Sequence, residues 1–249
     1  MKALITGASS GLGREFALVL SELGYDIIAI ARREDRLAEL KKEIKTNYSY
    51  FVCDLSDTKE CTVLYEKVKN EDIDIVINNA GFGLIGEFTE TELSRELEMI
   101  DVNCKALHIL TKLFLQKFYR ENKGYILNVC SIAAFLPGPL MATYYATKAY
   151  VLSLTRALYE EIRKDKKNIY VGVLCPGPVA TEFSRVSKAS FAIKSRKADK
   201  VAAYAIKRML KRKTTVLPGI EIKLSAFASK HLPWKLLVKI SCKVQKKKV

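Results

Sequence analysis

Histidine is scarce in this chain and its cysteines are scattered, which excludes the usual metal and disulfide architectures. Only two histidines, His108 and His231, occur among 249 residues, and no two of the six cysteines form a C-x-x-C pair. Zinc sites and disulfide frameworks need such groups at close spacing. We therefore predict no metal site, and thiols that stay free, as is typical of a reducing cytoplasm.

Long apolar runs are also missing. No segment reaches the roughly 18 uninterrupted apolar residues expected of a membrane span, and Met1-Lys2 lead directly into an apolar stretch rather than a signal peptide. Hydrophobic residues nevertheless make up 49% of the chain, enough to bury a large core. These features predict one cytoplasmic, globular domain over residues 1–249.

Acidic residues are nearly absent from the last quarter of the chain. Up to residue 184, 23 Lys and Arg oppose 25 Asp and Glu, whereas residues 185–249 hold 19 Lys and Arg against two acids. A nucleic-acid-binding domain would not confine its excess positive charge to one end. We predict no nucleic-acid partner, and we assign any basic partner surface to the extension 222–249.

A glycine-rich loop joins a short apolar run at residues 3–6 to a helical pattern at 14–23. It consists of Thr6-Gly7-Ala8-Ser9-Ser10-Gly11-Leu12-Gly13. Glycines let the backbone approach a pyrophosphate closely, and a helix N-terminus favours an anion. A plain tight turn could use the same residues, but the position between strand and helix favours phosphate binding.

The next apolar run, residues 26–31, ends at Arg32. In a dinucleotide-binding fold, an acid at this place holds the ribose 2′-hydroxyl and an arginine holds a 2′-phosphate. Arg32 therefore predicts NADP(H) rather than NAD(H). The plain alternative is that the neighbouring Arg33 and Arg36 form the solvated start of the next helix.

Strand and helix patterns go on alternating along the chain. Further strands are expected at 48–53, 73–77, 125–130, 169–174 and 215–217, and one long helical pattern at 89–119. This alternation predicts an α/β fold, a doubly wound parallel sheet (Rossmann fold) of about seven strands with helices on both faces. Ligands bind at the carboxyl ends of such strands, where Gly7, Arg32, Asp54, Asn79, Ser131 and Gly177 fall.

Tyr144 and Lys148 are four residues apart on the helical pattern that follows residue 131, so they share one face. An ammonium beside a phenol favours the phenolate, so Lys148 would lower the pKa of Tyr144 and prepare it for proton transfer. A half-buried tyrosine and a solvated lysine are the plain alternative. The plain alternatives for Ser131 and Asn103 are a strand-end cap and a helix-bending polar residue.

In their order along the chain, these motifs resemble the single-domain short-chain dehydrogenases/reductases over about residues 2–181. The resemblance is carried by the glycine loop, Asp54, Asn78-Asn79-Ala80-Gly81, Asn103, Ser131, Tyr144-x-x-x-Lys148 and Pro176-Gly177. It implies that Tyr144 is the general acid/base and that Lys148 holds the nicotinamide ribose. Ser131 would then hydrogen-bond the substrate oxygen, and Asn103 would steady a helix and a water in the proton relay.

The resemblance also implies a cofactor site. Its members would be Gly7, Ser9, Ser10, Gly11, Leu12, Gly13, Arg32, Asp54, Leu55, Asn79, Ala80, Gly81, Tyr144, Lys148, Pro176, Gly177, Val179 and Thr181. Many NADP-preferring members carry a basic residue before the middle glycine, where this chain has Ser10. The expected NADP(H) preference therefore depends on Arg32.

Two uncharged, apolar loops, residues 82–86 and 133–141, are expected to face the substrate. They predict a lipophilic hydroxy or keto compound, such as a steroid, an acyl chain or a prenoid. The alternative is that the loops pack on each other or on a second subunit. Residues 182–200 are expected to close over the substrate, and the resemblance implies a homodimer or homotetramer.

The tail, residues 225–249, has Lys235, Lys239 and Lys243 at helical spacing, away from Trp234, Leu237, Val238 and Ser241. Such a helix could lie on an anionic membrane. It could also pack on its own domain or across a dimer with a solvated lysine face, which is the favoured interpretation.

The predicted function is an NADP(H)-dependent oxidoreductase that interconverts a ketone and a secondary alcohol on a lipophilic substrate. The alternative function is a non-catalytic Rossmann-type scaffold that binds the cofactor as a ligand and docks through its basic tail.

Overall fold

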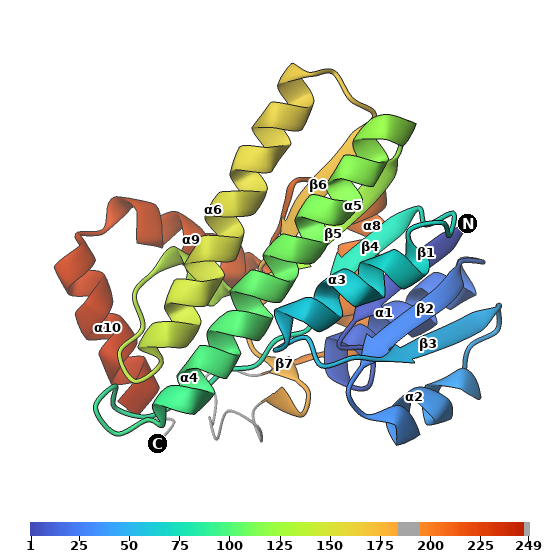
Figure 1. The fold of residues 1–249 in the computed structure, drawn as a ribbon. Helices are drawn as coiled ribbons and strands as arrows, with labels where there is room; N and C mark the ends of the chain where they lie inside the picture. Colours follow the sequence, from blue (N-terminus) through green and yellow to red (C-terminus); the bar gives the residue numbers. More distant parts are fainter. Residues whose placement is uncertain (184–194, 247–249) are drawn as a thin grey trace.

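The computed structural model describes residues 1–183 and 195–246, and its centre is a parallel sheet of seven strands (Figure 1). The strand order is β3-β2-β1-β4-β5-β6-β9. The strands are β1 (Lys2–Thr6), β2 (Asp26–Ala31), β3 (Tyr48–Val52), β4 (Ile75–Asn78), β5 (Gly124–Val129), β6 (Ile169–Leu174) and β9 (Thr215–Val216). The predicted doubly wound parallel sheet is confirmed.

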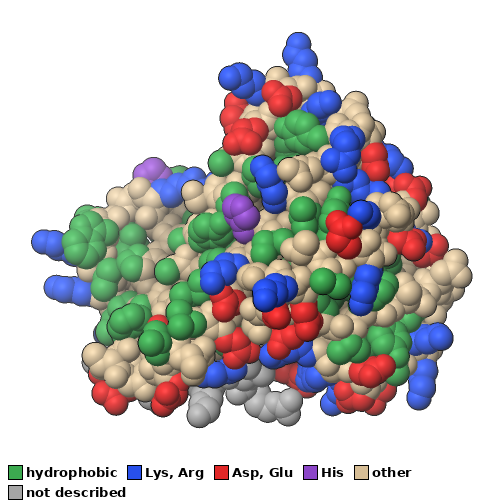
Figure 2. All heavy atoms as spheres, in the orientation of Figure 1, with side chains coloured by type: hydrophobic (Ala, Val, Ile, Leu, Met, Phe, Trp, Pro, Cys, Tyr) green, Lys and Arg blue, Asp and Glu red, His purple; other side chains and the backbone are tan. Residues whose placement is uncertain are grey.

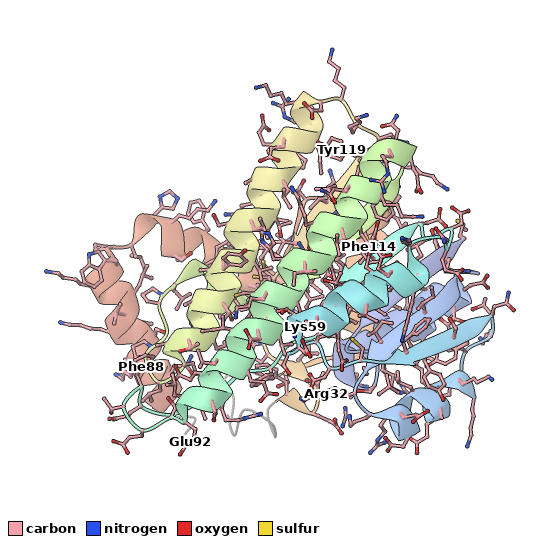
Figure 3. All side chains as sticks on the ribbon, viewed as in Figure 1. Arg32, Lys59, Phe88, Glu92, Phe114 and Tyr119 are labelled. Atoms are coloured by element: carbon pink, nitrogen blue, oxygen red, sulfur yellow. The ribbon has the colours of Figure 1, made fainter. Side chains whose placement is uncertain are left out.

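Helices cover both faces of this sheet. On one face, α1 (Gly11–Glu22), α2 (Glu34–Lys41) and α8 (Ala198–Leu210) bury apolar residues against the strands. On the other, α3 (Thr58–Val68), α5 (Leu107–Glu121) and α6 (Ala142–Lys164) do the same, as Figure 1 shows. Figure 3 labels Phe114 of α5, whose ring lies 5.2 Å from that of Tyr65 of α3. β4 and β6 are buried along their whole length, and apart from the buried Asn78 at the end of β4 their sequences carry no strongly polar side chain.

The long helical pattern at 89–119 is not one regular helix. α4 (Leu93–Ile100) is followed by a π-helical segment, η1 (Asp101–Ala106), before α5 begins. π-turns of this kind are rare and occur mostly at functional sites. Here the wide turn contains Asn103, which is fully buried.

The tail forms two helices rather than one. α9 (Ile220–His231) and α10 (Trp234–Lys246) are separated by Leu232 and Pro233, because Pro233 lacks the backbone N–H that a continuous helix needs. Ser241 and Gln245 of α10 are buried, and Gln245 donates a hydrogen bond to the Tyr145 hydroxyl. The favoured interpretation, in which this helix packs on its own domain, agrees with these contacts.

Two short strands pair near the segment that was expected to close over the substrate, one just before it and one within it. β7 (Val179–Ala180) pairs with β8 (Arg196–Lys197). Most of the predicted closing segment 182–200, namely residues 184–194, lies outside the described residues. No helix in 1–183 or 195–246 is both long and apolar enough to cross a membrane.

Candidate active site

The glycine loop after β1 is shaped by close contacts with its neighbours. Gly7 and Gly11 have positive φ angles of 67° and 56°, and a β-carbon at Gly13 would collide with the Gly7 carbonyl. These positions therefore require glycine. Asn79, after β4, braces the loop, because its side-chain amide donates to the Thr6 carbonyl at 2.9 Å.

The segment after β6 meets the same loop. A β-carbon at Gly11 would lie 3.1 Å from the Thr181 side chain, so Thr181 packs directly on the loop. The Pro176 carbonyl accepts a hydrogen bond of 2.9 Å from the Ile132 amide, which links this segment to the one after β5. The fold thus gathers predicted cofactor residues from the ends of β1, β4 and β6 at one edge of the sheet.

The two arginines after β2 have different neighbours. Arg32 contacts acids: its Nη1 lies 3.0 Å from Glu98 Oε1 and 3.9 Å from Asp54 Oδ2, and Figure 3 labels it. Arg33 instead donates to the Ser10 hydroxyl at 2.8 Å and the Ser9 hydroxyl at 3.1 Å. Arg33 does stand at the start of a helix, as the N-cap of α2, and its side chain is partly exposed, but its guanidinium also contacts the glycine loop.

Arg33 also forms an ion pair with Glu182 at 2.9 Å, at the start of the predicted closing segment. The contact of Arg33 with the glycine loop was not predicted, because Arg32 is the first residue after the apolar run 26–31 and was expected to be the cofactor contact. The alternation of side chains along a strand was the available signal, since it sends two successive arginines to opposite faces.

Asp54 lies beside Arg32 at the end of β3. Partial burial acts to raise the pKa of this carboxyl, but hydrogen bonds from Ser56 and the charge of Arg32 outweigh burial and lower it. The Asp54 carboxylate accepts from the Ser56 amide at 3.0 Å and from its hydroxyl at 2.8 Å. Asp54 is therefore an ionised acceptor at the edge of the predicted cofactor site. Leu55 beside it is buried.

Tyr144 lies in the first turn of α6, where only 7% of its surface is exposed. Burial raises the pKa of the Tyr144 phenol, although a hydrogen bond with the Ser131 hydroxyl acts to lower it. Burial also lowers the pKa of Lys148, whose ammonium lies 5.8 Å from the centre of the Tyr144 ring. The predicted lowering of the pKa of Tyr144 by Lys148 is therefore wrong for this structure, because burial dominates.

The Lys148 ammonium is buried with few partners. Among the described residues it donates one hydrogen bond, of 3.1 Å, to the Val129 carbonyl. An ammonium has three donors, so two remain for another partner. A β-carbon at Gly81 would lie 3.5 Å from the ammonium and 2.7 Å from Asn103 Oδ1, so the missing side chain leaves room between these two groups.

Asn103 connects the site to the loop after β4. Its side-chain amide donates to the Phe82 carbonyl at 2.9 Å and to the Thr147 hydroxyl at 3.1 Å, and its Oδ1 accepts from the Phe82 amide at 3.1 Å. Thr147 in turn donates to the Tyr144 carbonyl at 2.7 Å. Asn103 therefore steadies both η1 and the start of α6. The resemblance implied such a role in steadying a helix.

The two apolar loops meet around the Tyr144 ring. Phe82, Ala133, Met141 and Tyr144 belong to one buried cluster, and Leu84 and Ile85 pack against it. Phe183 completes the enclosure: its ring centre is 5.5 Å from that of Tyr144. A β-carbon at Gly83 would lie 2.8 Å from Phe183 Cζ, so a glycine lets the ring close down. Phe183 was not among the predicted site residues.

Two cavities flank α6 outside this enclosure. One of about 590 Å³ lies between the 134–139 loop and α6, and one of about 440 Å³ lies beside Phe88, Cys104 and Thr143. Tyr144 lines neither of them. The two loops thus pack on each other, as the alternative proposed, and do so directly over the phenol.

Comparison with known proteins shows the family to which this fold belongs. The family model described as short chain dehydrogenase matches residues 1–190. The chain belongs to this family. Within the described residues no cluster of potential metal ligands occurs.

Relatives and solved structures of the family are similar over most of the chain. A very-long-chain 3-oxoacyl-CoA reductase of Laccaria bicolor is 33% identical over 196 residues, which cover 76% of this chain and 57% of that protein. The hydroxysteroid dehydrogenase-like protein 1 of Gallus gallus is 33% identical over 87% of this chain and 67% of its own length. The short-chain dehydrogenase of Sphingobium yanoikuyae, solved in complex with NADPH, has a TM-score of 0.83 and 27% identity, covering 92% of this chain and 93% of that one.

Proposed function

We propose that this protein is an NADP(H)-dependent oxidoreductase that interconverts a ketone and a secondary alcohol on a lipophilic substrate. The observation that carries the proposal is the buried contact between the Tyr144 phenol and the Ser131 hydroxyl, with the Lys148 ammonium beside the same ring. Two hydroxyl donors at one point suit an oxygen that gains negative charge during reaction. The nicotinamide, when bound, supplies or accepts the hydride.

The raised pKa of Tyr144 suits the direction of reduction. A phenol whose pKa lies above its ordinary value of about 10 is protonated at neutral pH, so Tyr144 Oη holds the proton that the substrate oxygen needs. Ser131 would hold the same oxygen in place through its hydroxyl. Asn103 acts on these groups by positioning, because its contacts are with Phe82 and Thr147.

The residues present fit a nicotinamide dinucleotide. The glycine loop has no side chains at Gly7, Gly11 and Gly13 and leads into the N-terminus of α1, which suits a pyrophosphate. The two uncommitted donors of Lys148 suit the vicinal hydroxyls of a ribose. The apolar, buried Leu55 suits the ring of an adenine, and the ionised Asp54 suits its amino group.

The preference for NADP(H) is supported by Arg33 as well as by Arg32. The Arg33 guanidinium lies on the hydroxyls of Ser9 and Ser10, beside the end of β2 where a 2′-phosphate would come. Arg32 is held by Glu98 and Asp54, so it is the more neutralised of the two. The similar Sphingobium structure was solved with NADPH.

A lipophilic substrate is supported by the walls around Tyr144. Phe82, Met141 and Phe183 offer no charge and no strong hydrogen-bonding group. The names of the relatives, a 3-oxoacyl-CoA reductase and a hydroxysteroid dehydrogenase-like protein, are those of an acyl and a steroid type. A non-catalytic scaffold is not favoured, because such a protein has no need for the phenol, hydroxyl and ammonium together. The homodimer or homotetramer stays a prediction.

A substrate panel tests the proposal. The purified protein is incubated with NADPH or NADH and with 3-oxoacyl thioesters, steroid ketones, prenoid ketones and keto sugars, while reduced cofactor is followed by absorbance. We expect NADPH oxidation with one of the three lipophilic classes and none with the sugars. Turnover of sugars alone would refute the substrate class, and turnover of none would refute the enzyme.

A further inference from the structure

The tail helices expose an unusual number of large apolar side chains. Six of them make up what we term the α9–α10 face: Ile220, Leu224, Phe227, Trp234, Leu236 and Ile240, with 68%, 61%, 64%, 66%, 44% and 48% of their surfaces exposed. Figure 2 shows apolar side chains gathered over α9 and α10, on the left of the view, with Lys and Arg projecting from the edge. Clustered apolar exposure of this kind marks an interaction site.

The stripe on α9 is regular. Ile220, Leu224 and Phe227 are spaced by four and three residues, so they share one side of the helix. The opposite side of α9 is anchored, because Ile222 and Ala226 are buried. The helix is therefore held in place by one face and presents a second apolar face to solvent.

The helix α10 is anchored in the same manner. Its buried side carries Ser241 and Gln245, and the Gln245 side-chain amide donates a hydrogen bond to the Tyr145 hydroxyl. Leu236 and Ile240 lie on the other side. Trp234 falls on the helical side of Ser241, but it is exposed because it is the first residue of α10, beside the turn that leads from α9. The packing of α10 thus leaves these three apolar residues without a role in the fold.

Positive charge surrounds this face. Lys223, Lys230, Lys235, Lys239 and Lys243 are exposed, and within the described part of the chain none of them forms an ion pair. Glu221 is the one acid in the sequence of α9 and α10, and Arg196 neutralises it at 2.7 Å. Lys235 also lies 5.9 Å from the Trp234 ring. The face therefore combines apolar side chains with unpaired lysines.

We infer that the α9–α10 face docks on the surface of an anionic phospholipid bilayer. Aromatic and aliphatic residues enter the boundary between headgroups and acyl chains, while lysines meet the lipid phosphates. A second copy of this chain would bring its own five unpaired lysines to the contact, so like charges oppose self-association there. A nucleic acid would match the charge but leaves the aliphatic stripe unburied.

The single tryptophan of the chain makes a direct probe of this face. Full-length protein is titrated with vesicles of phosphatidylcholine, with or without phosphatidylglycerol, and Trp234 emission is followed. We expect a blue shift with the anionic vesicles, quenching by brominated acyl chains, and weaker binding at high salt. An emission that is unchanged by anionic vesicles would overturn the inference, as would equal binding to neutral ones.

A pair of variants separates docking through this face from non-specific binding through exposed apolar residues. Leu224→Ser with Phe227→Ser removes two exposed residues of the face, and we expect vesicle partitioning to fall by about tenfold or more. The matched control is Leu23→Ser with Val63→Ser, two half-exposed apolar residues of the α1 end and α3, which should partition like the wild type. Circular dichroism checks that both pairs are folded.

Two further outcomes would overturn the proposal. One is equal partitioning of the Leu224/Phe227 variant and the wild type. The other is found without vesicles: if sedimentation velocity shows a wild-type dimer that the Leu224/Phe227 variant alone dissociates, a second copy occupies the face. Neither readout depends on turnover, so the outcome is independent of the proposed oxidoreductase activity.

Discussion

Two adjacent arginines show how much depends on the direction of one side chain. Arg32 faces Glu98 and Asp54, whereas Arg33 contacts Ser9, Ser10 and Glu182. A 2′-phosphate at this edge would meet in Arg33 a guanidinium whose neighbours are mainly hydroxyls. Charge-assisted hydrogen bonds to phosphate are the strong ones. Arg33 is therefore expected to contribute more to cofactor choice than Arg32.

The prediction at this scale concerns cofactor affinity. Arg33→Ala should raise the Kd of NADPH by about ten- to a hundredfold, since a hydrogen bond to a charged group is worth roughly 1.5–3 kcal/mol, and should leave the Kd of NADH nearly unchanged. The matched control, Arg32→Ala, should have the smaller effect. Cofactor fluorescence titration measures both constants. A larger effect at Arg32, or equal losses for the two cofactors, contradicts this assignment.

Residue identity could be predicted here, but residue environment could not. Tyr144 and Lys148 were found from their spacing, and the structure places them on one helix beside Ser131. The sign of the pKa shift of Tyr144 was predicted wrongly, because burial by Phe82 and Phe183 is a tertiary effect. Segments far apart in the chain create it, so local spacing carries no trace of it.

Among the elements, η1 is the one that most directly shapes the site. A π-turn widens the helix between α4 and α5 and holds Asn103 in the interior. Its side chain satisfies both backbone groups of Phe82. Removing it would leave buried polar groups unpaired, which costs about 1–3 kcal/mol for each group.

Asn103→Ala should therefore lower the free energy of unfolding by about 2–4 kcal/mol. Asn70→Ala is the matched control, because Asn70 is exposed in the turn after α3 and should change stability by less than about 0.5 kcal/mol. Urea unfolding followed by circular dichroism gives both values. If the two variants were equally stable, the bracing role of Asn103 would be excluded.

Some elements could be predicted closely and others could not. The expected limits of β2 and β6 agree with the structure, because each is a continuous apolar run with a clear boundary. The π-turn could not be predicted, since apolar residues follow a helical period through it. The break between α9 and α10 did have a signal in the sequence, because Pro233 disfavours a continuous helix there.

At the scale of the whole molecule, the site and the tail are neighbours. α9 contacts the segment after β6, because a β-carbon at Gly177 would collide with Ile222. α10 contacts Tyr145, the residue next to Tyr144. The helices that carry the proposed lipid-binding face thus pack against the segments that line the proposed site for a lipophilic substrate. This proximity could not be foreseen, since it depends on how the tail folds back over α6.

The central claim is that Tyr144 exchanges the proton with the substrate oxygen. Tyr144→Phe keeps the ring that packs on Phe183 and removes only the hydroxyl. The most direct test is the kcat of NADPH-dependent reduction of the best lipophilic ketone by wild type, Tyr144→Phe and the neighbouring control Tyr145→Phe. We expect a fall of about a hundredfold or more for Tyr144→Phe alone, with the Kd of NADPH nearly unchanged. A Tyr144→Phe variant as active as the wild type would contradict the account.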